Sequence, residues 1–166
     1  MTAARQKRKL HRAFFAVAAC VAAALCVFAS AAQAGLTQRI VVNWHSGLAI
    51  SGFDPVAYFT DGKPMAGSPD FELRYGGVIW RFCNSGNRAA FAARPDIYMP
   101  QYGGYDPVDV ARGLAVAGDP DLWTIAGERL FLFYDDTQRK KFMTDSARFI
   151  ALSQHEWPDV MLTLDP

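Results

Sequence analysis

The sequence predicts a small α+β domain, in which antiparallel β-hairpins pack against short helices. Three observations support this class. Strand-like residues flank a two-residue turn in two places, an Asp-Pro-Val motif occurs twice, and apolar residues alternate with more polar ones beside the first turn. The 166 residues are 51% hydrophobic and 20% charged, which is typical of a globular chain and excludes disordered, collagen-like and coiled-coil proteins.

The first 34 residues have the organisation of a secretory signal peptide. A basic start is followed by an apolar stretch over residues 13–32 and by Ala32-Gln33-Ala34, whose small residues suit a signal peptidase. We expect cleavage before Gly35 and export to a bacterial periplasm. The alternative is an uncleaved anchor in the inner membrane, because this apolar stretch is just long enough to span a bilayer. In that case the uncleaved segment would be the chain's one contact with the membrane.

The rest of the chain is predicted to be one domain over residues 48–158, with a lead-in over residues 35–47 and a C-terminal tail over residues 159–166. Five of the 17 basic side chains lie in residues 1–34, which hold no acidic residue, so the remaining chain carries 12 basic against 16 acidic side chains. This balance argues against nucleic acid as a partner. Cys83 is the single thiol after residue 34, so no internal disulfide can form there.

Each Asp-Pro-Val motif predicts the start of a short helix. Asp54 and Asp106 are good N-caps, because a carboxylate oxygen can accept a backbone N–H, and the proline that follows each loses no hydrogen bond in the first turn. The expected helices cover residues 56–59 and 108–112.

Each short helix is followed by a predicted hairpin and then by a second helix. Gly76-Gly77 and Gly127-Glu128 are the expected turns, because glycine favours the positive φ angles of a type I′ turn. Val78, Trp80 and Phe82 alternate with other residues along one strand, so we expect them on a core-facing side. The expected strands are residues 71–75 with 78–82, and residues 123–126 with 129–133. Cap signals at Asn84-Ser85 and Asp135-Asp136 then predict helices that carry Phe91 and Phe142 inward.

The order of these elements indicates two copies of one unit, each a short capped helix, an antiparallel hairpin and a helix, over residues 52–98 and 104–149. Gly52-Phe-Asp-Pro-Val56 returns as Gly104-Tyr-Asp-Pro-Val108. We interpret this similarity as an ancient duplication, and chance similarity is the alternative. Matching aromatic residues of the two hairpins are expected to share one core: Trp80, Phe82, Phe131 and Phe133.

Four segments together resemble the YHS domain family: Gly52–Phe59, Trp80–Ser85, Phe91–Tyr98 and Pro100–Tyr105. The resemblance extends over nearly all of the chain after residue 47. It implies a small module that occurs alone in exported bacterial proteins or is attached to metal transporters and some oxygenases. It therefore implies copper or another soft metal as a ligand, and a metal transporter or a respiratory or oxygenase component as a partner.

The cysteines of the metal-associated branch of this family are only partly present. Ala57 and Asn87 stand where that branch has cysteines, and Cys83 is retained. With His45 and His155 it makes three candidate metal ligands, too few for a four-coordinate zinc site. Copper(I) accepts two or three soft ligands, including thioethers. The methionines that could supply a thioether are Met65, Met99, Met143 and Met161.

Each candidate also has a purely structural interpretation. Cys83 precedes a helix start and follows Arg81, which would lower its pKa and suit a nucleophile, soft ligand or redox sensor; the alternative is a buried apolar residue at a strand end. For His45 and His155 the alternative is a solvated side chain, in a loop and on the last helix. Gln101–Tyr105 predicts either an aromatic-lined pocket between the two copies or a tight turn whose tyrosines cover the core.

The leading functional hypothesis is an exported, non-catalytic binding module that takes copper or a small ligand. If Cys83 ligates copper(I), the variant Cys83→Ser should lose the ion, because no second thiol can compensate. Two alternatives stay open. One is a thiol-dependent enzyme or redox sensor that uses Cys83, and the other is a structural or interaction domain without a small ligand.

Overall fold

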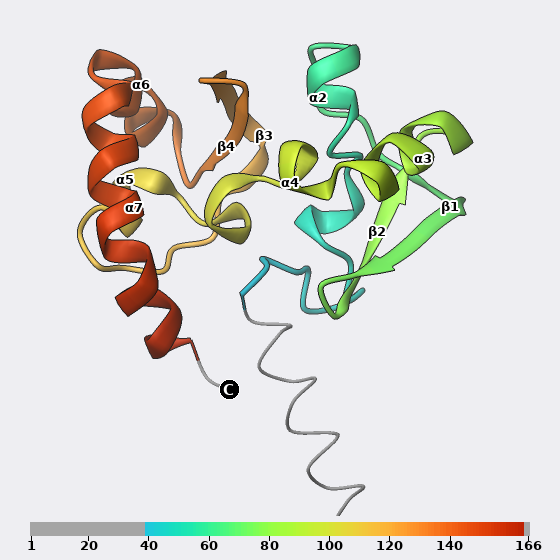
Figure 1. The fold of residues 1–166 in the computed structure, drawn as a ribbon, viewed down its shortest axis with the longest axis horizontal. Helices are drawn as coiled ribbons and strands as arrows, with labels where there is room; N and C mark the ends of the chain where they lie inside the picture. The colour runs from blue at the N-terminus through green and yellow to red at the C-terminus, as the bar shows by residue number, and fades with distance from the viewer. Residues whose placement is uncertain (1–38, 165–166) are drawn as a thin grey trace, which may run out of the picture. The chain divides into compact units, whose positions relative to one another are not determined.

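The computed structural model describes residues 39–164, which lie in one compact unit (Figure 1). In this range the chain forms six α-helices and two separate antiparallel hairpins, which confirms the α+β class. None of the described helices is long and apolar enough to cross a bilayer. The signal peptide expected at residues 1–34 lies outside the described residues.

The elements alternate in the order that the motifs predict (Figure 1). Residues up to Tyr98 form the 3-10 helix η1 (Ile50–Gly52), α2 (Ala57–Thr60), β1 (Ser68–Tyr75), β2 (Val78–Phe82), α3 (Ser85–Ala93) and α4 (Pro95–Tyr98). Later residues form the 3-10 helix η2 (Gln101–Gly104), α5 (Pro107–Val110), β3 (Asp119–Ala126), β4 (Arg129–Phe133), α6 (Asp136–Thr144) and α7 (Ser146–Thr163).

Both hairpins close through the predicted two-residue turns. φ is +62° and +84° at Gly76 and Gly77, and +55° and +59° at Gly127 and Glu128, so each turn has the left-handed backbone of a type I′ hairpin. The pairing register shifts once in each hairpin, between Ser68 and Glu72 and between Asp119 and Trp123. Because pairing resumes beyond this irregularity, β1 and β3 begin three to four residues earlier than the sequence pattern predicts.

The same left-handed turn precedes both short helices. φ is +41°, +56° and +82° over residues 50–52, and +55°, +64° and +94° over residues 102–104. The turn aims the last carbonyl at the following hairpin, where Gly52 O accepts the Gly67 N–H and Gly104 O accepts the Gly118 N–H, each at 2.9 Å. The two turns therefore anchor both hairpins by the same backbone contact.

The predicted helix caps are present. Asn84 accepts the Asn87 N–H and Asp135 accepts the Gln138 N–H, both at 2.8 Å, so α3 and α6 start with a satisfied donor. The last helix, α7, continues through Pro158 to Thr163, and Val160 is buried. Residues 159–163, expected in a tail, thus belong to a helix that packs on the domain.

The core consists of two hydrophobic clusters, so the expectation that the four hairpin aromatics share one core is wrong. Trp80 and Phe82 lie in the first cluster, whereas Phe131 and Phe133 lie in the second. Each hairpin folds over its own helix, and Phe91 of α3 and Phe142 of α6 fill the space between. Each of these four aromatic side chains is therefore enclosed by its own hairpin and helix.

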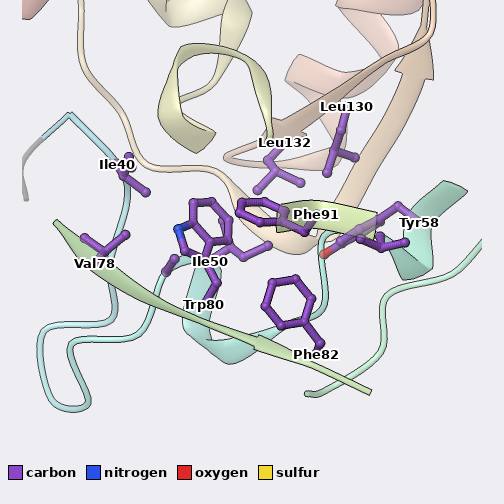
Figure 2. Packing of buried hydrophobic residues seen from close by; sticks show 11 residues of the cluster. Ile40, Ile50, Tyr58, Val78, Trp80, Phe82, Phe91, Leu130 and Leu132 are labelled. Carbon is purple, nitrogen blue, oxygen red and sulfur yellow. The ribbon is translucent and has the colours of Figure 1, made fainter. Parts of the chain in front are cut away.

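The strand β4 connects the two clusters because both of its faces are buried. Phe131 and Phe133 point into the second cluster, while Leu130 and Leu132 on the opposite face belong to the first. Figure 2 shows Leu130 and Leu132 pointing from β4 towards Phe91 and the other side chains of the first cluster. A strand buried on both faces ties the two halves of the domain together.

Candidate functional site

Asp54 is a buried carboxylate that joins three elements. Its Oδ1 accepts the Val56 N–H at 2.8 Å, at the start of the first short helix. Its Oδ2 accepts the Cys83 N–H at 2.8 Å and the Asn87 side-chain amide at 2.7 Å. Asp54 therefore fixes the end of β2 and the first turn of α3. Its predicted role as N-cap of the short helix is wrong, because α2 begins later, at Ala57, and Asp54 instead holds the turn that precedes it.

The Cys83 thiol lies beside this carboxylate and is half-buried. Burial raises the pKa of Cys83 to about 11, and its hydrogen bond to Asp54 and the negative charge of that carboxylate act in the same direction. The Arg81 guanidinium is paired with Glu72 at 2.9 Å. The predicted lowering of the Cys83 pKa is wrong, because burial disfavours the thiolate and the neighbouring Asp54 carboxylate adds to that effect.

The reactivity of Cys83 should follow this pKa. In a chain whose Cys20 and Cys26 are replaced by serine, iodoacetamide is expected to react slowly at pH 7, and the rate should rise with pH until about 11. In urea the rate should level off near the ordinary thiol value of 9.0. Mass spectrometry of the alkylated protein at a series of pH values measures both profiles. A folded-state rate that is already maximal at pH 7 would contradict this assignment.

Asp106 occupies the matching position in the second half. It is fully buried, and it accepts the Val108 N–H at 2.7 Å and the Tyr134 N–H at 2.8 Å. Burial raises the pKa of Asp106 above its ordinary value, and the backbone hydrogen bonds offset only part of that rise. Tyr134, which follows β4 as Cys83 follows β2, is exposed. Both carboxylates are therefore architectural groups.

The two histidines lie on the surface and apart from Cys83. His45 is in an exposed turn, where its ring lies against that of Trp44 at an angle of 34° between the ring planes. His155 is on α7, with Nδ1 3.0 Å from Glu156 Oε1. Over residues 39–164, no three His, Cys, Asp or Glu side chains are placed together to hold a metal ion. The structure thus does not bring Cys83, His45 and His155 into a common site.

A pocket of about 300 Å³ lies elsewhere, beside η2. Segments far apart in the sequence contribute its walls: the start of the described chain, the first hairpin turn, α4 and the residues after it, η2 and α7. The lining residues are Arg39, Ile40, Gly76, Asp96, Met99, Pro100, Gln101, Tyr102, Gly103, Trp157 and Met161. Most of this surface is apolar or aromatic, and Arg39, Asp96 and Gln101 add polar groups.

Both interpretations of the Gln101–Tyr105 segment hold in part. Tyr102 and Gly103 form a left-handed turn, and Tyr102 is buried in the second cluster, with its ring 5.6 Å from that of Trp157. Gln101, Tyr102 and Gly103 also line the pocket. The Gln101–Tyr105 motif therefore indicated the position of the pocket. That Met99 and Met161 also line it follows only from the tertiary fold.

Gly103 allows the N-terminal segment to close one side of the pocket. The Val41 N–H donates to Gly103 O at 2.8 Å, and a Cβ on Gly103 would collide with the carbonyl oxygen of Arg39. Its φ of +64° is also unfavourable for other residues. Glycine at this position is therefore required for the segment around Arg39 and Ile40 to reach the pocket.

Comparison with known proteins identified no relative of this chain. A scan against protein-family models, a search of curated proteins and a search of solved structures each found no match for the chain.

Proposed function

We propose that this chain is an exported, non-catalytic binding module of the YHS type, and that its ligand is a soft metal ion or a small molecule held in the pocket beside η2. The observation that carries the proposal is the pocket itself. It combines aromatic and thioether side chains with a few polar groups, which is the usual composition of a small-ligand site. A partner that delivers or receives a soft metal, such as a transporter or a respiratory or oxygenase component, fits this proposal.

The proposal includes the duplication of one unit. Asp54 and Asp106 each accept the backbone N–H of the residue two positions further on and the N–H of the residue that follows the second strand of the hairpin. Phe91 lies 5.0 Å from Trp80 and 5.3 Å from Phe82, measured between ring centroids. Phe142 lies 5.0 Å from Phe131 and 5.2 Å from Phe133. Such agreement in caps, turns and ring packing supports common descent over chance.

The pocket then lies beside the first copy and the segment that connects the two copies. Gly76 and Asp96 come from the first copy, and Gln101–Gly103 connects the copies. Trp157 and Met161 lie on α7, which packs on the second copy through the Ser153 hydroxyl and the Pro107 carbonyl at 3.0 Å. A ligand in this pocket would contact the first copy, the connecting segment and the part of α7 that follows the second copy.

The ligand site is testable with nuclear magnetic resonance on the exported protein, labelled with ¹⁵N. Silver(I) and a set of small aromatic acids, amines and amides serve as probes. The proposal expects at least one probe to shift the amide signals of Ile40, Gln101 and Gly103. Shifts confined to the region of Cys83 would favour the thiol-dependent alternative, and a complete absence of shifts would favour an interaction domain.

Export is a separate part of the proposal. We expect the protein to accumulate in the periplasm with Gly35 as its first residue, because the basic start, the apolar stretch and Ala32-Gln33-Ala34 form a complete signal. N-terminal sequencing of the periplasmic fraction measures this. Full-length protein held in the inner membrane would instead establish the uncleaved anchor.

A further inference from the structure

Two of the methionines converge on one pocket. The chain has four methionines after residue 34, and they are far apart in the sequence. Met99 and Met161 both line the pocket beside η2. Met143, by contrast, is 61% exposed, and Met65 is half-buried near the first hairpin and is not among the lining residues.

We infer that this pocket binds a soft monovalent cation, copper(I) or silver(I), through the thioether sulfurs of Met99 and Met161. The inference rests on the proposed function and specifies the ligand of that site. It assigns the ion to two of the four methionines that the sequence offers as thioether ligands, and not to Cys83 or the two histidines.

The chemistry of the lining favours such an ion. A thioether is a soft, uncharged ligand that selects copper(I) and similar cations over zinc, magnesium or calcium. It carries no proton to lose, so it can ligate at neutral pH. The Trp157 ring, which also lines the pocket, can stabilise a cation by its π-electron face.

Local structure holds the sulfur-bearing residues in place. Trp157 and Met161 are four residues apart on α7 and therefore lie on the same side of that helix. Met99 follows α4, where its N–H donates to Pro95 O at 2.9 Å, and it precedes the buried Pro100. One sulfur thus comes from a helix and the other from a fixed segment that faces the same pocket.

The formal charges around the pocket are balanced. Arg39 contributes a positive charge and Asp96 a negative one, and Asp96 also pairs with Arg94 at 3.5 Å. The lining therefore has no excess of charge that would select a hard divalent cation or an anion. The two thioether sulfurs and the Trp157 ring are therefore the groups that select the ligand, and they favour a soft cation.

The test is a titration with silver(I), which is a redox-stable probe for copper(I) sites. Every protein carries serine in place of all cysteines, because silver(I) binds any accessible thiol. Isothermal titration calorimetry compares this background with the variants M99L, M161L and the double variant, and M143L is the matched control. Leucine keeps nearly the same volume, so the fold should be retained, and circular dichroism checks this.

We expect one silver ion per cysteine-free chain. Each pocket variant should weaken binding by about tenfold or more, the double variant should abolish it, and M143L should leave it unchanged. Anaerobic titration with copper(I) against a chelator should give the same order. Binding that is unaffected in the double variant would overturn the inference, as would an absence of binding in the cysteine-free background.

Failure of this inference is distinguishable from failure of the proposed function. If silver(I) does not bind but a small aromatic probe still shifts the amide signals of Ile40, Gln101 and Gly103, the pocket is a site for organic ligands. If neither kind of probe affects these signals, the proposed function fails as well.

Discussion

Replacing Asp106 by alanine is expected to lower the free energy of unfolding by about 3–5 kcal/mol. The Asp106 side chain is fully buried and accepts the N–H groups of Val108 and Tyr134. Alanine would leave both donors without a partner, and an unsatisfied buried donor costs about 1–3 kcal/mol. It would also leave a cavity between α5 and the end of β4. Urea denaturation at pH 7 measures the change.

Two further measurements distinguish the structural role of Asp106 from the effect of removing any negative charge. Asp159→Ala removes an exposed carboxylate from α7 and should change the stability by less than about 0.5 kcal/mol. The pKa of Asp106 is raised in the folded protein, so its contribution is fully present below the ordinary value of 3.8 and is lost as the pH rises through the raised value. The cost of Asp106→Ala should therefore increase as the pH falls from 7 towards 4. A cost below about 1 kcal/mol at every pH would contradict the assignment.

Truncation of a core aromatic in either half should have a similarly large effect. Trp80→Ala and Phe131→Ala are each expected to cost about 3–5 kcal/mol, because both side chains are almost completely buried against a helix phenylalanine. Thermal and urea unfolding measure these costs. Costs near zero for either variant would show that its cluster does not stabilise the domain.

The division of the core into two clusters is tested by milder double variants. Phe82 and Phe91 are in ring contact at 5.3 Å, so Phe82→Leu and Phe91→Leu should be non-additive by about 0.5 kcal/mol or more. Phe82 and Phe142 lie in different clusters, so the corresponding double variant should be additive within about 0.5 kcal/mol. Strong coupling between Phe82 and Phe142 would restore a single shared core.

The elements that could be predicted from the sequence are those with a local cause. Gly76-Gly77 and Gly127-Glu128 specify their turns through backbone conformation, and Asp106, Asn84 and Asp135 specify helix starts through hydrogen bonds within three residues. These interactions need no tertiary contact. The sequence pattern therefore placed the hairpins and helices in the correct order.

What could not be predicted depends on contacts between distant segments. Leu130 and Leu132 bury the second face of β4 only because the first cluster packs against it. The raised Cys83 pKa depends first on burial in the folded domain and then on Asp54, which lies 29 residues away in the sequence. Met99 and Met161 become partners only when α7 docks near η2. No spacing in the sequence marks such a pair.

Crystals of the cysteine-free protein soaked with silver(I) provide the most direct test of the proposed binding site, because anomalous diffraction locates the ion itself. The account predicts one silver peak per chain in the pocket beside η2, in contact with the Sδ atoms of both Met99 and Met161. A peak on His45 or His155 with none in the pocket, or no ordered peak at all, would contradict it.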